Sequence, residues 1–420
     1  MILNVPALLS AIAAVFWLIA PPQSAQDWPQ FRGPTGQGLA SDPDAPLEWS
    51  ATDNVLWKQP IPGRGWSSPV ISGDRVWLTT AVMQGGAQSL RLIALDFASG
   101  REVLNVEVAK AYRNEFSTNA KNSEATPTPI VAGARVFVHF GATATAAVST
   151  DGKVLWKTQL PHANQHGQGS SPALVGDLLV INCDGFDEAY VVALDVSNGR
   201  TRWRRPRRTP FSQAYSTPLE IEVGGATQII SVGASYTTAL DPATGREIWR
   251  VFYRDGFSNV PRPVFAHGLV FITTGFQQPS LLAVQPDGEG DVTRSRVVWS
   301  TSRGVPFTPS PIVVGDILYM VNDTGIASAL DAKTGEVKWV QRLGGNYSAS
   351  PVAAAGRIYF TSEEGLTTVI AAGSEFKVLA RNAIDDGVLA SLAFSRGSIV
   401  LRSSKYVYRL GRAAERRPGL

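Results

Sequence analysis

The stretch that decides the fold is SSPALVGDLLVINCDGFDEAYVVALDVSNGRTRW, residues 170–203. Its first part, 170–181, places Ser-Ser-Pro before an apolar run that a Gly-Asp pair interrupts. Its last part, 193–203, has a Gly four residues after Asp195 and a Trp four residues after that Gly. An Asp that opens a turn accepts backbone N–H bonds, and the Gly takes the positive φ that closes a hairpin. Because apolar runs flank both turns, the segment predicts four short antiparallel strands.

Both parts of this unit recur along the chain. The first part occurs eight times, the last time in degenerate form, at 67–78, 126–138, 170–181, 216–232, 261–272, 310–321, 348–360 and 389–401. The second part follows at 94–104, 149–156, 193–203, 239–249, 283–299 and 329–339, and without its Asp and Trp at 369–379. The prolines of the first part are mostly 40 to 50 residues apart. Four strands at this period are typical of a β-propeller blade.

The count of repeats predicts an all-β, eight-bladed propeller of four-stranded antiparallel blades over residues 54–410, with seven blades as the alternative. The last copy lacks a fourth strand, and NVLWKQP (54–60) is an extra strand at the other end. We expect 54–60 to complete the last blade and close the ring. Residues 26–53 would be an irregular leader, with 26–50 outside the ring, and 411–420 a tail. The tryptophans should pack between neighbouring blades: Trp156, Trp203, Trp249, Trp299 and Trp339.

Composition excludes several classes of protein. Lys and Arg number 38 against 35 Asp and Glu, so the net charge of +3 does not suit a protein that coats nucleic acid. The single cysteine, Cys183, excludes an internal disulfide, a thiolate zinc site, a CxxCH haem attachment and an iron–sulfur cluster. With four histidines in the chain, a His-rich metal centre is not expected.

The N-terminus predicts export. Residues 5–20 form an apolar run of 16, followed by Pro21-Pro22 and the small residues Ser24-Ala25. This length suits a signal peptide, 1–25, better than a membrane span, and no other stretch is long enough to span. An uncleaved N-terminal anchor is the alternative. We therefore expect a monomer in the periplasm or outside the cell.

The repeat resembles the PQQ-like β-propeller repeat of quinoprotein dehydrogenases and of the outer-membrane-assembly propeller lipoprotein. DWPQFRGPTGQG (27–38) also resembles the leader of exported PQQ-like propeller proteins. The resemblance to the dehydrogenases implies a vicinal disulfide over the quinone and a calcium held by acidic and amide side chains. Cys183 alone cannot form that disulfide, so no cofactor is predicted, and PQQ with calcium stays an alternative. The assembly lipoprotein has a lipidated cysteine that this chain lacks after its apolar run.

Residues just before each innermost strand should converge at one mouth of the central channel. The candidate ligand-binding set is Asn122, Glu124, His166, Tyr215, Arg262 and Tyr347. It suits a polar or anionic ligand, although solvated loops would have the same composition. His162 and His166 have a metal-like spacing without a third ligand, so no metal site is predicted. Arginines around Trp203 are either a solvated strand or a patch for an acidic partner.

No catalytic residue is predicted. We expect a non-catalytic binding or scaffold protein of the cell envelope, whose partners are envelope proteins or a polar or anionic ligand, not nucleic acid. The alternatives are a PQQ-dependent oxidoreductase and a carbohydrate-binding or carbohydrate-cleaving propeller. Fold alone does not decide between them.

Overall fold

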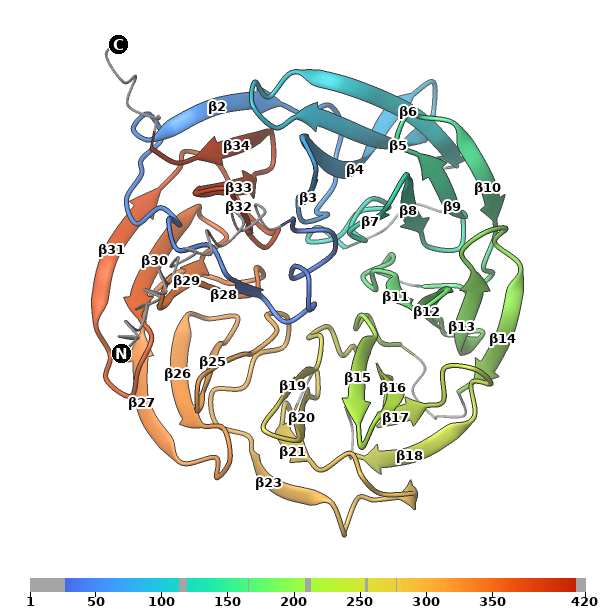
Figure 1. The fold of residues 1–420 in the computed structure, drawn as a ribbon, viewed down its shortest axis with the longest axis vertical. Coiled ribbons are helices and arrows are strands. Elements are labelled where there is room, and N and C mark those ends of the chain that lie inside the picture. Colours follow the sequence, from blue (N-terminus) through green and yellow to red (C-terminus); the bar gives the residue numbers. More distant parts are fainter. Residues whose placement is uncertain are drawn as a thin grey trace, which may run out of the picture.

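Eight sheets surround one axis in the computed structural model, which describes residues 27–112, 119–164, 166–207, 213–253, 256–276 and 278–412 (Figure 1). In this described part, every element of regular secondary structure is a β-strand. Each sheet contains one four-stranded antiparallel blade. The prediction of an eight-bladed propeller is confirmed, and the alternative of seven blades is wrong.

The first four blades follow the chain in order. Blade 1 is β3 (Val70–Ser72), β4 (Arg75–Gln84), β5 (Ala87–Asp96) and β6 (Glu102–Ala111). Blade 2 is β7 (Ile130–Ala132), β8 (Arg135–Phe140), β9 (Ala144–Ser149) and β10 (Val154–Thr158). Blade 3 is β11 (Ala173–Val175), β12 (Leu178–Asp184), β13 (Ala189–Asp195) and β14 (Thr201–Pro206). Blade 4 is β15 (Leu219–Val223), β16 (Ala226–Val232), β17 (Tyr236–Leu240) and β18 (Glu247–Phe252), with β22 (Gly290–Asp291) added at its outer edge.

The other four blades complete the ring. Blade 5 is β19 (Val264–Ala266), β20 (Leu269–Thr273), β21 (Leu281–Val284) and β23 (Val297–Thr301). Blade 6 is β24 (Ile312–Val314), β25 (Ile317–Val321), β26 (Ile326–Asp331) and β27 (Val337–Arg342). Blade 7 is β28 (Val352–Ala354), β29 (Arg357–Thr361), β30 (Leu366–Ala371) and β31 (Val378–Ala383). Blade 8 is β32 (Ala393–Ser395), β33 (Ser398–Arg402), β34 (Tyr406–Leu410) and β2 (Val55–Pro60).

Blade 8 joins the two ends of the chain. β2 pairs antiparallel with β34, from Val55 opposite Leu410 to Pro60 opposite Tyr406. The predicted closure by residues 54–60 is therefore confirmed. Because an N-terminal strand completes a C-terminal sheet, no blade leaves the ring open.

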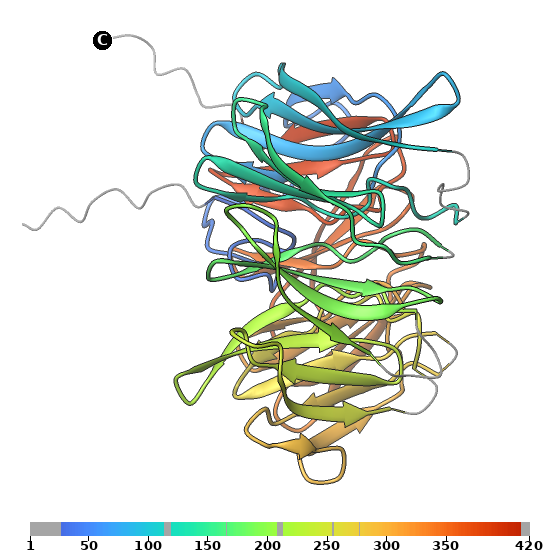
Figure 2. The same ribbon diagram turned by 90° about the vertical axis from the view of Figure 1, so that its right-hand side faces the viewer.

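The two faces of the ring differ in the segments that they carry. One face, which we call the turn face, carries the Gly-Asp turns after each innermost strand and the hairpins before each outermost strand. The other, the connection face, carries the hairpins between second and third strands and the segments that lead from one blade to the next. In Figure 2 the turn face lies on the left, and the long β4–β5 hairpin extends to the right on the connection face.

On the turn face, one local design links neighbouring blades. In blade 4, Asp241 Oδ1 accepts the backbone N–H of Thr244, and the N–H of Gly245 donates to the Asp241 carbonyl. Gly245 has φ of +68°, and a Cβ there would lie 2.6 Å from the Trp203 ring. Trp203 comes from blade 3 and donates its Nε1–H to Pro242 at 2.7 Å. The Gly is therefore needed both for the turn and for the close approach of the preceding blade's Trp.

The predicted packing of tryptophans between blades is confirmed, with two variations. Trp156 and Trp299 donate to the next blade in the same way as Trp203. Trp249 faces the altered turn of blade 5 and donates to Gln228, which in turn donates to Pro286 of that turn. Trp339 faces the turn that lacks its Asp, and it packs on Phe376 with ring centroids 5.1 Å apart. An aromatic contact replaces the hydrogen bond there.

A ring of hydrogen bonds joins the blades near the axis. The residue before each repeat's proline is a Ser or Thr in six of the seven repeats that have one, and Ser391 holds the same place in blade 8. The N–H at this position donates to the hydroxyl of the next blade in seven bonds of 2.9–3.1 Å. At the eighth position stands Arg262, which has no hydroxyl. This arrangement explains why the repeat has a hydroxyl residue before Pro.

The leader does not lie outside the ring, so that prediction is wrong. It crosses the axis on the turn face (Figures 1 and 2), where β1 (Leu39–Ala40) pairs in parallel with β28. Trp28 exchanges two backbone hydrogen bonds with Ile71 of blade 1 and is 1% exposed. Arg32 donates to Pro311 of blade 6 at 2.8 Å. Burial of a large aromatic and satisfaction of carbonyls near the axis hold the leader inside.

The predicted signal peptide lies outside the described residues, as do residues 413–420 of the predicted tail. In the part of the chain that is described, no helix could cross a membrane.

Candidate functional site

Three of the six predicted site residues meet on the connection face. Asn122 donates its Nδ2–H to the carbonyl of His166 at 2.7 Å. The rings of His166 and Tyr215 lie 6.5 Å apart. These residues precede blades 2, 3 and 4, so the ring brings three separate segments together. Because His166 and Asn122 are partly exposed, this group could contact a ligand.

Two other predicted residues are buried in the ring. Glu124 is 9% exposed. Tyr347 is 0% exposed and packs in an apolar cluster with Ile312 and Phe360. Burial raises the pKa of Tyr347 to about 12, so its phenol stays neutral. Tyr347 is therefore placed to pack blades rather than to meet a ligand.

Arg262 lies near the axis and faces the leader. Its Nε–H and Nη2–H donate to the Pro218 carbonyl at 3.1 and 2.8 Å, and its Nη1–H donates to Phe31 at 2.8 Å. It is 3% exposed, and burial lowers the pKa of its guanidinium to about 9. Arg262 therefore fixes the leader inside the ring.

The histidines do not form a metal centre in the described part of the chain. His162 contacts Leu160 O through Nδ1 at 2.7 Å and Gln168 Oε1 through Nε2 at 3.0 Å, so both ring nitrogens are used. No three His, Cys, Asp or Glu side chains among the described residues are grouped as a metal ion requires. His162 thus contacts residues of its own loop, and the His166 carbonyl accepts a hydrogen bond from Asn122.

Among the described residues, two features bear on the alternative of PQQ with calcium: the single cysteine and the placement of the acidic side chains. Cys183 is buried within β12, and burial raises its thiol pKa well above its usual range. Among the described residues, no three acidic side chains are grouped so that carboxylates alone could hold calcium. The leader also occupies the axis on one face.

Four arginines of the cluster around Trp203, from Arg202 to Arg207, each have an acidic partner. Arg202 pairs with Asp195 at 3.0 Å, and Arg205 pairs with Glu247 at 3.3 Å. Arg204 pairs with Glu188, and Arg207 pairs with the buried Asp184 at 2.8 Å. Local acids thus neutralise most of this charge, which favours the interpretation as a solvated strand.

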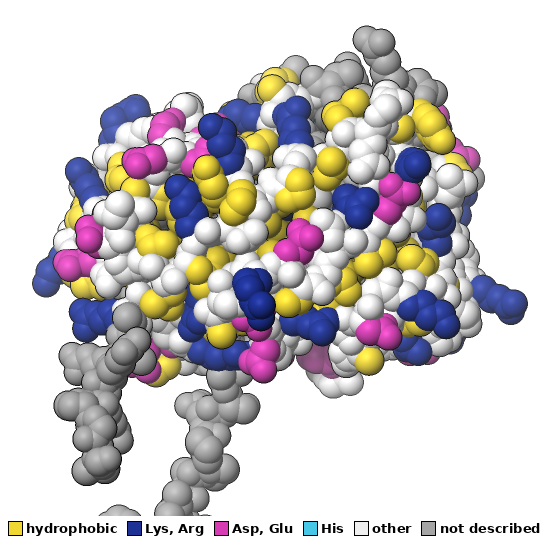
Figure 3. Space-filling model, turned by 90° about the horizontal axis from the view of Figure 1, so that it is seen from above, with side chains coloured by type: hydrophobic (Ala, Val, Ile, Leu, Met, Phe, Trp, Pro, Cys, Tyr) yellow, Lys and Arg dark blue, Asp and Glu magenta, His cyan; other side chains and the backbone are white. Residues whose placement is uncertain are grey.

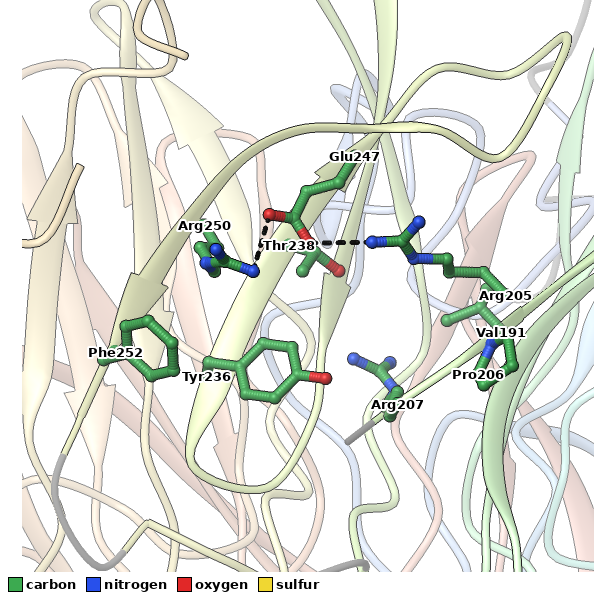
Figure 4. A pocket seen from close by; sticks show the side chains of 9 residues that line it. All are labelled: Val191, Arg205, Pro206, Arg207, Tyr236, Thr238, Glu247, Arg250 and Phe252. Carbon is green, nitrogen blue, oxygen red and sulfur yellow. Dashed lines mark hydrogen bonds and ion pairs between the residues drawn. The ribbon is translucent and has the colours of Figure 1, made fainter. Parts of the chain in front are cut away.

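One cavity adjoins this cluster and was not predicted. It has a volume of about 380 Å³ and lies between blades 3 and 4 (Figure 4). Its walls include Arg205 from β14, Arg207 just after β14, Tyr236 from β17, and Arg250 and Phe252 from β18. The repeat could not reveal it, because these positions face each other only when two blades are side by side. In the sequence, the arginines on both sides of Pro206 are the feature that could have pointed to an anion-binding cavity here.

Comparisons with known proteins agree with the repeat. The family model described as outer membrane protein assembly factor BamB matches residues 48–220 and 233–398. The chain is 27% identical over 290 residues to the outer membrane protein assembly factor BamB of Burkholderia pseudomallei, covering 64% of this chain and 70% of that protein.

Two solved structures share the fold. The europium-containing methanol dehydrogenase has a TM-score of 0.69 at 10% identity, over 91% of this chain and 90% of its own. BamB from Moraxella catarrhalis has a TM-score of 0.57 at 12% identity, over 85% of this chain and 99% of its own. At these identities the likeness concerns the propeller and not its activity. Because the family model matches most of the sequence, the chain belongs to the family described as outer membrane protein assembly factor BamB.

Proposed function

We propose that the chain is a non-catalytic scaffold of the cell envelope that takes part in outer-membrane protein assembly. Its family membership and its similarity to an assembly factor support this role. The predicted export signal, 1–25, would deliver the chain to the cell envelope, where the proposed role requires it.

The observation that carries the proposal is where large apolar side chains are exposed. Among the described residues, the exposed Met, Phe and Tyr side chains all lie on the connection face, in a hairpin, in a connection or at the end of a strand. They are Met83, Tyr112, Phe186, Phe252 and Phe276. Phe186 is 62% exposed, and Phe276 is 53% exposed. Aromatic residues and Met are enriched in protein interfaces.

The outer wall differs from this surface. Its exposed apolar residues are short aliphatic ones such as Val298 and Val337. Over blades 8 and 1, Lys and Arg, Asp and Glu, and hydrophobic side chains are interspersed (Figure 3). Scattered single hydrophobic residues are ordinary for a protein surface. The connection face is therefore the proposed docking surface.

The experiment is complementation in a host strain that lacks the gene. We expect the deletion to lower the amount of outer-membrane proteins, and the native chain to restore it. A triple variant, Met83→Ser, Phe186→Ser and Phe276→Ser, should not restore it. The matched control, Val337→Ser with Val340→Ser on the outer strand β27, should restore it fully.

An unchanged outer-membrane protein content in the deletion strain would contradict the proposal. The oxidoreductase alternative has its own assay, dye-linked oxidation of alcohols and sugars by purified protein supplied with PQQ and calcium. Turnover there would replace a scaffold role with a catalytic one.

A further inference from the structure

The cavity between blades 3 and 4 is large enough for an organic ligand. Its volume of about 380 Å³ falls in the range of small-molecule sites. Its walls come from the outer strands of two blades, so it opens on the circumference and not on the axis. Of the exposed Met, Phe and Tyr residues of the connection face, Phe252 alone also lines this cavity, and the other lining residues have no part in the scaffold role.

The walls carry more positive than negative charge toward the opening. Arg205 and Arg250 share one carboxylate, Glu247, at 3.3 and 3.0 Å (Figure 4). The two guanidinium side chains are 43% and 40% exposed, whereas the Glu247 side chain is 14% exposed. An incoming anion therefore meets the two cations before it meets the carboxylate. Asp291 on β22 adds negative potential near Arg250, and Arg294 offsets it.

The base of the cavity is closed by a pair that is already satisfied. Arg207 contacts Asp184 at 2.8 Å and donates to Asn182 Oδ1 at 3.1 Å and to Ser231 Oγ at 2.6 Å. Its side chain is 2% exposed. Arg207 thus shapes the base, while Arg205 and Arg250 remain as the groups for a ligand.

One wall is aromatic. The rings of Tyr236 and Phe252 lie 5.6 Å apart at 58°, and the Arg250 guanidinium carbon lies 5.6 Å from the centre of the Phe252 ring. Phe252 is 43% exposed. A flat apolar group can pack on this wall while an attached anion reaches the guanidiniums.

Strand β22 supports this aromatic wall from the side away from the cavity. Among the described strands, β22 is the one added to the outer edge of a blade, beside β18. Val292 donates its N–H to the Arg250 carbonyl at 2.9 Å, and the Phe252 N–H donates to Thr293 Oγ1 at 2.9 Å. Because the backbone from Arg250 to Phe252 is fixed on both sides, little ordering is needed on binding.

We propose that this cavity binds a small organic anion, a carboxylate or phosphate on a planar apolar group, through Arg205 and Arg250 with Phe252 as the platform. Inorganic anions are too small to use both the guanidiniums and the aromatic wall. The chemistry of recognition is the arginine–oxyanion hydrogen bond, which carboxylate and phosphate share.

The test is titration calorimetry of the full chain with phenyl phosphate and, separately, with benzoate. We expect at least one probe to bind saturably. Arg205→Gln and Arg250→Gln should each weaken it at least fivefold, and higher salt should weaken it further. Glu247→Gln should tighten it a few-fold, because the competing carboxylate is removed. The tighter of the two probes identifies the anionic group.

The matched control is Arg296→Gln, which removes another partly exposed arginine paired with an acid, Asp287. It should leave binding unchanged. The inference is overturned if neither probe saturates, if Arg205→Gln binds as well as the native chain, or if Glu247→Gln weakens binding. Equal melting temperatures of the variants would show that each result concerns binding and not folding.

Discussion

The turn face and the connection face are built from the same strands, yet they differ in regularity. On the turn face, Asp, Gly and Trp recur blade after blade, and Trp203 contacts the turn at Gly245 as Trp156 contacts the turn at Gly199. On the connection face, neighbouring segments share no such pattern, and the residue types of His166, Phe186 and Phe276 do not recur from blade to blade. Repetition thus specifies how blades join, and the residues free of repetition are those available for recognition.

The largest effect on stability is expected on the turn face. Trp203→Ala removes a ring that is 8% exposed and its hydrogen bond to Pro242, and should cost about 3–5 kcal/mol of unfolding free energy. Leu155→Ala, on an outer strand and 43% exposed, is the control and should cost under about 0.5 kcal/mol. Denaturant titration measures both. Similar losses for the two variants would mean that the contact of Trp203 with the neighbouring turn does not stabilise the ring.

A second substitution tests the axis that lies between the faces. Arg262→Ala leaves the Pro218 and Phe31 carbonyls without their donor and should cost about 2–3 kcal/mol. Arg262→Ser supplies the hydroxyl that the ring lacks at this position, so it should recover about 1 kcal/mol. Thermal unfolding of both variants measures the difference. If Ser is no better than Ala, the hydroxyl ring does not stabilise the blades.

Acid should act through the connection-face end of blade 2. His139 is 0% exposed, and burial, with His162 nearby, lowers its pKa to about 3. The folded state therefore keeps His139 neutral, while the unfolded chain takes up a proton below pH 6.5. Stability is complete above about pH 6.5 and falls toward pH 3, by about 2 kcal/mol between pH 6.5 and 5.

Chemical denaturation at several pH values measures this slope. His139→Gln should flatten it over that window. A slope that is unchanged in His139→Gln would assign the acid sensitivity to other groups.

The smallest effect on stability is expected for exposed residues of the connection face. Phe276→Ser changes a side chain that is 53% exposed and should alter the free energy of unfolding by under about 0.5 kcal/mol. The same variant should still weaken complementation in the host. A large loss of stability instead would mean that Phe276 supports its neighbours Phe257 and Phe307 structurally.

The architecture could be predicted from sequence because its determinants are local and repeated. Asp241, Gly245 and the Trp four residues later describe one turn, and eight copies of the first half-motif count the blades. The position of the leader could not be predicted, since the partners of Trp28 and Arg32 are single residues of distant blades. The repeat assigned Arg262 to the correct blade, but it could not predict that its side chain points to the leader.

The candidate sites were harder to predict for the same reason. Asn122 and His166 meet because blades 2 and 3 are adjacent, which the repeat does indicate. The cavity between blades 3 and 4 depends on how two sheets lie against each other, and its wall at β18 is flanked by β22 (Gly290–Asp291), a strand that the repeat does not contain. Their side chains have no periodic signal, so only the folded ring brings them together.

The pairing of β2 with β34 has a consequence for the order in which the chain matures. Val55 is synthesised long before its partner Leu410, so β2 has unpaired backbone groups until the strands of the other seven blades have been made. Such long-range pairing slows folding and exposes an edge to other chains in the meantime. A chain shortened by even the last strand would keep seven finished blades and an open edge. Synthesis of β34 is thus the step that allows the ring to close.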